Sequence, residues 1–93
     1  MATKIEVSRQ MLLHAASLRD AGKPCLKEAS MAKLFASEAA VRACDVASRV
    51  LASYGYAMEY PVQRYLRDIR FTLIGGGTSD ILKLIIAKEL STA

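Results

Sequence analysis

The sequence predicts an all-α fold, and three observations support this. Apolar residues recur at helical spacing through most of the 93 residues. No stretch alternates apolar and polar residues for long enough to form a strand. Gly and Pro occur only in three short clusters, at 22–24, 55–61 and 75–77, which divide the chain. We therefore expect an up-and-down antiparallel helical bundle of three long helices and one short helix.

The first helix is expected over residues 4–20. Thr3 and Glu6 have the spacing of a capping box, in which each side chain accepts a hydrogen bond from the other residue's amide. Gly22 and Pro24 end this helix, because glycine accepts a left-handed position after a helix and proline cannot extend one. The short connection makes the next helix antiparallel to the first.

The second helix is expected over residues 26–53, where the sequence contains no Gly or Pro. Its apolar stripe is accompanied by many Ala and Ser residues, which allow neighbouring helices to approach closely. Gly55 is expected to end the helix. Neighbouring helices can then pack on both sides of it.

A short helix over residues 62–71 follows Pro61, which suits the first position of a helix. Its inward-facing residues are expected to be Val62, Tyr65, Leu66 and Ile69. Tyrosines cluster around this junction, and we expect them to turn their rings inward and leave their hydroxyls in water. These are Tyr54, Tyr56, Tyr60 and Tyr65.

The run Gly75-Gly76-Gly77 is expected to be a loop, because consecutive glycines do not hold regular structure. Thr78, Ser79 and Asp80 then provide an N-cap and an acidic first turn for a last helix. Flexible glycine backbone before a helix N-terminus has the parts of an anion site. The spacing matches neither a P-loop nor a dinucleotide fingerprint, and a plain connection between helices remains the other interpretation.

Size and composition restrict the class of protein. A chain of 93 residues, 53% of them hydrophobic and with a mean hydropathy of +0.20, suits one small domain but not a complete flavin, nicotinamide or ATP enzyme. It contains no apolar run of membrane-spanning length and no signal peptide. Cys25 and Cys44 would lie about 28 Å apart on one helix, so we expect reduced thiols and a cytoplasmic or other reducing compartment.

Two further patterns in the sequence are not expected to form a catalytic, metal-binding or nucleic-acid-binding site. His14 has no carboxylate, thiol or second His at helical spacing, so neither a metal site nor a general base is expected. The net charge is +4, and Arg64, Arg67 and Arg70 recur along the short helix. Asp68 and Glu59 lie among them, so we expect a solvated face with internal salt bridges and no nucleic-acid partner.

Three separated motifs resemble the C-terminal helical domain of the acyl-CoA dehydrogenases. They are Gly22-Lys23-Pro24 with the run 27–40, the run 55–64 with Arg67-Asp68-Ile69-Arg70, and Gly77-Thr78-Ser79-Asp80-Ile81. The resemblance covers essentially the whole chain. It implies that residues 1–93 form a single C-terminal bundle, incomplete on its N-terminal side, of a protein with further helical and β-domains.

The resemblance implies an FAD-dependent enzyme that removes hydrogens from the α and β carbons of an acyl-CoA thioester. In the family, the residue before Gly-Thr-Ser is usually the glutamate that takes the α-proton, and here it is Gly76. The resemblance therefore implies no catalytic residue in this chain. Either the base lies on an upstream helix, as in the long-chain and isovaleryl members of the family, or activity is lost. Gly76 and Gly77 remain substrate-binding candidates, because a backbone N–H can still donate to the thioester carbonyl. The isolated chain is expected to be inactive.

The resemblance also implies cofactor and partner contacts. Thr78, Ser79 and Asp80 match the family's loop against FAD. Arg49 and Ser53 stand where the family's Gln-x-x-Gly-Gly contacts the ADP end of a neighbouring subunit's FAD. The implied partners are an acyl-CoA, an electron-transfer flavoprotein and further copies of the same chain. The alternative function is a non-catalytic helical oligomerisation module derived from this fold.

Overall fold

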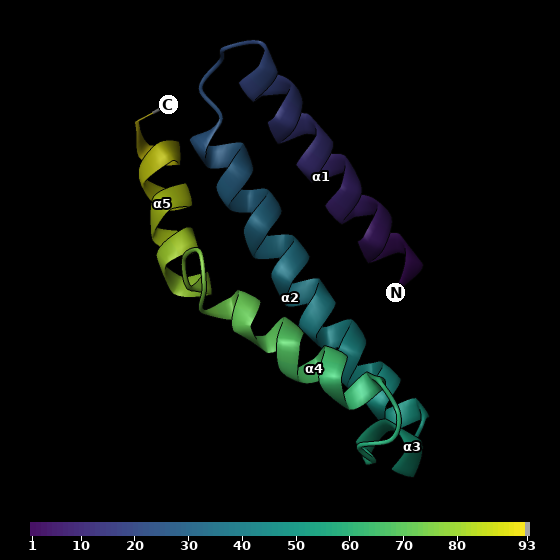
Figure 1. The fold of residues 1–93 in the computed structure, drawn as a ribbon. Helices are drawn as coiled ribbons and strands as arrows, with labels where there is room; N and C mark the ends of the chain where they lie inside the picture. The colour runs from purple at the N-terminus through teal and green to yellow at the C-terminus, as the bar shows by residue number, and fades with distance from the viewer. Residues whose placement is uncertain (93) are drawn as a thin grey trace.

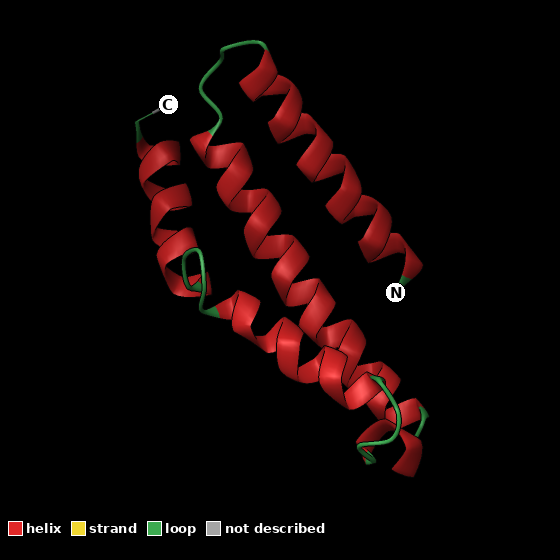
Figure 2. Ribbon diagram, in the orientation of Figure 1, coloured by secondary structure: helices red, strands yellow, loops and turns green. Residues whose placement is uncertain are grey.

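A computed structural model describes residues 1–92, and these residues contain helices and no strand (Figure 2). The elements, in order, are α1 (Ala2–Asp20), α2 (Leu26–Val50), α3 (Ser53–Tyr56), α4 (Val62–Arg70), the 3₁₀ turn η1 (Phe71–Leu73) and α5 (Ser79–Ser91). The predicted all-α class is confirmed.

Helix α2 is the centre of the molecule (Figure 1). Helix α1 runs antiparallel along one side of it, whereas α4 and α5 follow one another back along the other side. Each of these three helices packs against α2. The molecule is consequently elongated, with extents of 48 × 23 × 18 Å.

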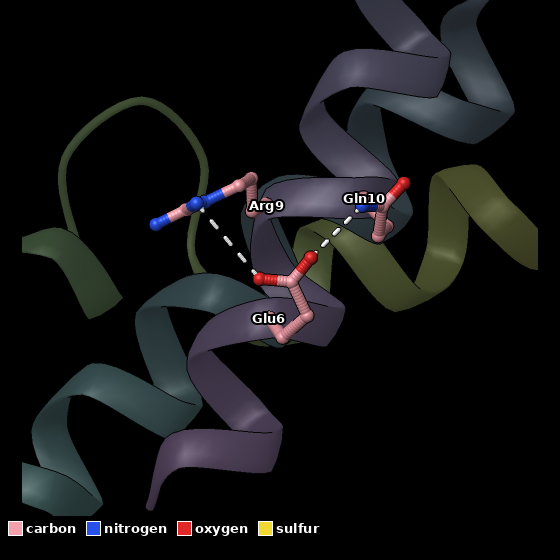
Figure 3. Close-up of polar contacts among 3 residues, drawn as sticks. All are labelled: Glu6, Arg9 and Gln10. Carbon is pink, nitrogen blue, oxygen red and sulfur yellow. Dashed lines mark hydrogen bonds and ion pairs between the residues drawn. The ribbon is translucent and has the colours of Figure 1, made fainter.

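Helix α1 begins earlier than predicted, and the capping box is wrong. The amide of Ile5 already donates to the Met1 carbonyl at 3.1 Å, so Thr3 lies inside the helix and cannot cap it. Glu6 instead accepts from Gln10 Nε2 at 2.9 Å and lies 3.9 Å from Arg9, both on the exposed surface (Figure 3). Such exposed contacts along a helix contribute only a few tenths of a kcal/mol each.

Helix α2 ends earlier than predicted, at Val50 rather than near residue 53. Ala52 adopts φ +52°, a conformation that costs a residue with a Cβ about 1–2 kcal/mol. The chain turns there into the short α3, which contains Gly55. A Cβ at Gly55 would overlap the backbone carbonyl of Ser48, so the glycine permits close approach of α3 to α2 rather than ending the helix.

The tyrosine prediction is wrong, because all four predicted rings are exposed. Tyr54 and Tyr60 pack edge to face with ring centroids 5.0 Å apart, which closes the turn locally. On α4, Val62, Leu66 and Ile69 are partly buried as predicted, but Tyr65 is exposed. The reason is that α4 has only α2 beneath it, so its inward stripe is narrow.

The arginine face is solvated, as predicted, but the predicted salt bridges are not found among residues 1–92. Arg64, Arg67 and Arg70 are exposed, and neither Asp68 nor Glu59 pairs with any of them. The guanidinium of Arg64 lies 5.7 Å from the ring centroid of Tyr65 instead.

The core is small and lies along α2. Its buried apolar residues are Ala15, Ala32 and Leu82, and the buried Ser30 and Ser37 accompany them. Small side chains at these contacts let the helix axes approach closely, which explains the Ala- and Ser-rich composition of α2. Within the described chain, large aliphatic or phenyl side chains remain exposed on α1, α2, η1 and α5, whereas the large side chains that α3 and α4 expose are tyrosines.

Both cysteines are free thiols, as predicted. Cys25 precedes the first residue of α2 and Cys44 lies within that helix, and each is partly buried. No helix formed by residues 1–92 has the length and apolar character needed to span a membrane.

Candidate functional site

The candidate site is the glycine loop, residues 75–77, which joins η1 to α5 beside the middle of α2. Gly76 and Gly77 adopt φ values of +72° and +104°, which residues with a Cβ rarely adopt. The backbone conformation at these two positions therefore favours glycine over any residue with a Cβ. The predicted loop is confirmed.

Thr78 caps the last helix, as predicted. Its Oγ1 accepts a hydrogen bond from the amide of Ile81 at 3.2 Å, and its backbone is extended immediately before α5. Asp80 lies in the first turn, where its negative charge complements the positive end of the helix dipole. Ser79 donates from Oγ to Glu38 Oε1 on α2 at 2.6 Å.

A run of unpartnered backbone donors passes through this loop. Within residues 1–92, the amides of residues 76–80 donate to no backbone or side-chain acceptor. Gly76, Thr78 and Asp80 are exposed and Gly77 and Ser79 are half-buried, so this stretch of backbone lies at the surface. Successive amides that point outward at a helix N-terminus form a receptor for carbonyl oxygens and anions.

Lys33, on α2, supports the loop from beneath. Its Nζ donates to the carbonyl oxygens of Thr72 and Gly77, the latter at 2.8 Å. Sequence reasoning missed Lys33 and also Glu38, because their loop partners lie 39 to 44 residues away along the chain. The only local signal is a lysine within the small-residue stripe that packs against other helices.

The space at Gly76 is open. A Cβ built there meets only the Lys33 Cε, at 4.0 Å. Gly76 itself has no side chain at the position where the family that the sequence resembles usually has a catalytic carboxylate. Instead, the site presents hydrogen-bond donors and room for a ligand.

Arg49 and Ser53 lie elsewhere, at the C-terminal end of α2 and the start of α3. Arg49 is largely exposed, and its Nε pairs with Asp45 Oδ2 at 3.2 Å. Lys33 lies beneath the glycine loop, and Arg49 is about 24 Å further along the helix at about 1.5 Å per residue. One chain therefore presents two separate groups of predicted flavin contacts.

The two groups fit FAD to different degrees. The outward amides of residues 78–80 suit the flavin's carbonyl and phosphate oxygens. Arg49 offers an exposed charge for a phosphate, although Asp45 competes for it. Ala52 already has a positive φ of the kind that a glycine would adopt. Its methyl group, rather than the backbone of the turn, therefore limits how closely FAD can approach.

Two open grooves flank α2, and the sequence analysis predicted neither. One, of about 400 Å³, lies between α1 and α2 and is mainly apolar, with Ile5, Ala40 and Val46 in its walls. The other, of about 470 Å³, lies between α2 and α4 and carries charges from both helices. Its charged residues are Glu38, Arg42, Asp45, Arg67 and Arg70.

His14 is exposed on α1. Within residues 1–92, no three His, Cys, Asp or Glu side chains are grouped closely enough to hold a metal ion.

Comparison with known proteins agrees with this geometry. The profile of the family described as "Acyl-CoA dehydrogenase, C-terminal domain" matches residues 1–91. Benzylmalonyl-CoA dehydrogenase of Aromatoleum aromaticum is 67% identical over 92 residues, which cover 99% of this chain and 24% of that protein. The chain thus spans about a quarter of the length of the relatives that it matches.

Solved structures give the same result for the fold. Butyryl-CoA dehydrogenase from Megasphaera elsdenii superposes with a TM-score of 0.94 at 35% identity, covering 98% of this chain and 24% of that one. The FAD complex of PigA superposes with a TM-score of 0.94 at 32% identity, with the same coverage. Sequence, fold and the glycine loop before α5 together show that the chain belongs to the acyl-CoA dehydrogenase family and is related to its C-terminal domain.

Proposed function

We propose that the protein containing this chain is an FAD-dependent acyl-CoA dehydrogenase, and that the chain contributes substrate and flavin contacts from its glycine loop. The observation that carries the proposal is the run of outward, unpartnered amides at residues 76–80. A thioester carbonyl gains negative charge as its α-carbon becomes an enolate, and fixed N–H donors stabilise that charge. Gly76 and Gly77 provide such donors.

The cofactor contacts are divided between the two groups described above. Thr78, Ser79 and Asp80 bind FAD with their amides and the Thr78 and Ser79 hydroxyls, while Arg49 and Ser53 contact an ADP end. Bound FAD supplies the hydride acceptor of the reaction. The family resemblance assigns the Arg49 group to the flavin of a neighbouring copy.

The absent carboxylate at Gly76 suggests a substrate class. A relative is a benzylmalonyl-CoA dehydrogenase, whose substrate carries a carboxylate on the carbon next to the thioester. In such a 2-carboxyacyl-CoA, the bond to the carboxylate breaks, CO₂ leaves, and the electron pair stays on the α-carbon. The enolate would then form without a protein base, and bound FAD would supply the acceptor for the hydride lost from the β-carbon. We assign this class to the open site at Gly76.

The partners follow from the same reaction. The two electrons must leave the protein, and an electron-transfer flavoprotein is the acceptor that we propose. A structural neighbour comes from work on the electron transferring flavoprotein of Acidaminococcus fermentans. The free thiols of Cys25 and Cys44 support a cytoplasmic or other reducing compartment.

The alternative function, a non-catalytic oligomerisation module, is favoured by one observation. The described chain buries few large apolar side chains and exposes many, including Ile81, Leu84 and Leu90 on α5. Exposed apolar surface of this kind favours association with other protein surfaces. We expect a homo-oligomer under either proposal.

The test uses the full-length protein and follows the absorbance of its flavin. Benzylmalonyl-CoA should bleach the oxidised flavin and release CO₂, whereas 3-phenylpropionyl-CoA, which lacks that carboxylate, should bleach it at least about 10²-fold more slowly because Gly76 supplies no base to take its α-proton. Equal rates would contradict the base-free substrate class. Bound flavin that no acyl-CoA reduces would contradict the dehydrogenase proposal and favour the module.

A further inference from the structure

We propose that Lys33 is a positioning residue of the glycine loop. Its ammonium clamps the carbonyls of Thr72 and Gly77 to α2, and thereby holds in place the loop whose unpartnered Gly76 and Gly77 amides donate to a thioester carbonyl. The inference rests on the proposed function for the identity of its ligand. The clamp itself rests on the geometry of this chain.

The clamp encloses the loop on both sides. Thr72 lies in η1, before the glycines, and Gly77 is the last residue before the Thr78 cap. One side chain thus bonds the two carbonyls between which residues 73–76 lie. Thr72 is also held by its own hydroxyl, which donates to the Ile69 carbonyl at 2.6 Å.

The loop needs such a clamp because of its composition. Three consecutive glycines lose more backbone entropy on ordering than any other residues would. Within residues 1–92, Gly76 and Gly77 form no hydrogen bond through their own amides. Without Lys33, little else in the described chain would keep these two residues in one conformation.

The clamp also sets the direction of a donor. All peptide bonds between described residues are trans, so the C=O and N–H of each peptide unit point in opposite directions. Because the Gly77 carbonyl points to Lys33, the Thr78 N–H points away from α2. A positive charge on the carbonyl polarises the peptide and strengthens its N–H as a donor.

Lys33 is suited to this role because no carboxylate competes for it. Among residues 1–92, its ammonium forms no ion pair, and the side chain is partly buried against the loop. A charged donor to a carbonyl in partly buried surroundings forms a stronger hydrogen bond than a neutral one. The Ser79–Glu38 contact is exposed, so it anchors the start of α5 more weakly.

The test compares three variants of the full-length protein. Lys33→Met removes the donors at nearly constant volume, Lys33→Arg retains charge and donors, and Lys83→Met removes an exposed lysine of α5 as the control. Hydrogen exchange is measured without ligand at the hydrogen-bonded amides that flank the loop, Gly75, Ile81 and Leu82. Cinnamoyl-CoA is then bound, because hydrogen bonds to its thioester oxygen move its absorption band to longer wavelength.

In Lys33→Met, the amides of Gly75, Ile81 and Leu82 should exchange about tenfold faster because the loop between them loosens, and most of the band shift should disappear. Lys33→Arg should keep more than half of the shift, and Lys83→Met should change neither measurement. If the Lys33 hydrogen bonds served stability alone, Lys33→Met would lower the melting temperature and leave the absorption shift of cinnamoyl-CoA intact. That result would overturn the positioning role. Exchange within twofold of the wild-type rate would overturn the clamp.

If Lys33→Met does not fold, Lys33→Gln replaces it, because its amide keeps two donors on a shorter side chain. Faster exchange of the flanking amides than in wild type supports the clamp, and equal exchange overturns it. A wild-type protein that protects these flanking amides but causes no band shift would leave the clamp standing and contradict the proposed thioester contact.

Discussion

Individual glycines determine where two helices of this chain can approach each other closely and where space is left for a ligand. Gly55 lies against the backbone of α2, Gly22 lies in open solvent, and Gly76 lies in an open site with a left-handed backbone. Glycine thus allows a helix contact at Gly55, a turn at Gly22 and access for a ligand at Gly76. Substitution by alanine or glutamate separates these roles.

Gly55→Ala should destabilise the protein by about 3 kcal/mol or more, because its Cβ would overlap the Ser48 carbonyl and the backbone of α2 cannot move aside cheaply. Gly22→Ala is the matched control, since its Cβ would meet nothing within 4 Å. It should cost only about 1 kcal/mol, from its φ of +73°. Urea denaturation measures both, and equal losses would contradict the close contact.

Gly76→Glu should give the full-length protein a carboxylate at the position of the family's usual base. Oxidation of 3-phenylpropionyl-CoA should then become about 10²-fold faster than in Gly76→Ala, which shares the same backbone strain without the acid. Each variant should lose about 1 kcal/mol of stability, because Gly76 has φ +72°. Stopped-flow reduction of the flavin measures the rates. Equal rates in the two variants would show that another residue already acts as base.

At the scale of the element, α5 combines a well-defined start with an open face. Thr78 caps it through Oγ1 and Leu82 anchors it to α2, while Leu84 and Leu90 remain exposed. The first turn is therefore held in place although most of the helix is covered on one side only. This arrangement suits a helix whose N-terminal amides bind a ligand.

Thr78→Ala should lower the free energy of unfolding by about 1 kcal/mol, because the Ile81 amide loses its acceptor. Thr92→Ala is the control at the opposite end, where the hydroxyl bonds only exposed carbonyls of the last turn. It should change stability by less than about 0.5 kcal/mol. Thermal unfolding followed by circular dichroism measures the difference, and an undiminished stability of Thr78→Ala would exclude the cap as a source of stability.

At the scale of the whole molecule, one central helix supports all the others. The described chain buries Ala15, Ala32 and Leu82 along α2 and leaves large apolar side chains exposed on its outer helices. Such a single layer of helices leaves both of its faces open. We therefore expect further protein surface to cover them.

The chain should self-associate, and Leu84→Asp should weaken the assembly. Leu84 is 66% exposed in this structure, so a charge there costs little in the single chain but would be buried unpaired in an interface. Light scattering at tens of micromolar should show a mass above that of one chain, reduced by Leu84→Asp. Lys83→Asp, on the same helix, should leave the mass unchanged. A monomer in the wild type, or an unchanged mass in Leu84→Asp, would contradict this interface.

The sequence by itself predicted the four longer helices, the glycine loop and the Thr78 cap, but not the short α3. These depend on periodicity, glycine backbone freedom and capping chemistry, which act within a few residues. The family resemblance also followed from motifs in the sequence. Only the tertiary structure decided where α2 ends, that all four tyrosines are exposed, and that Lys33 and Glu38 hold the loop. The physical reason is that these outcomes depend on packing between segments some 40 residues apart, where hydrogen-bond partners leave no local pattern.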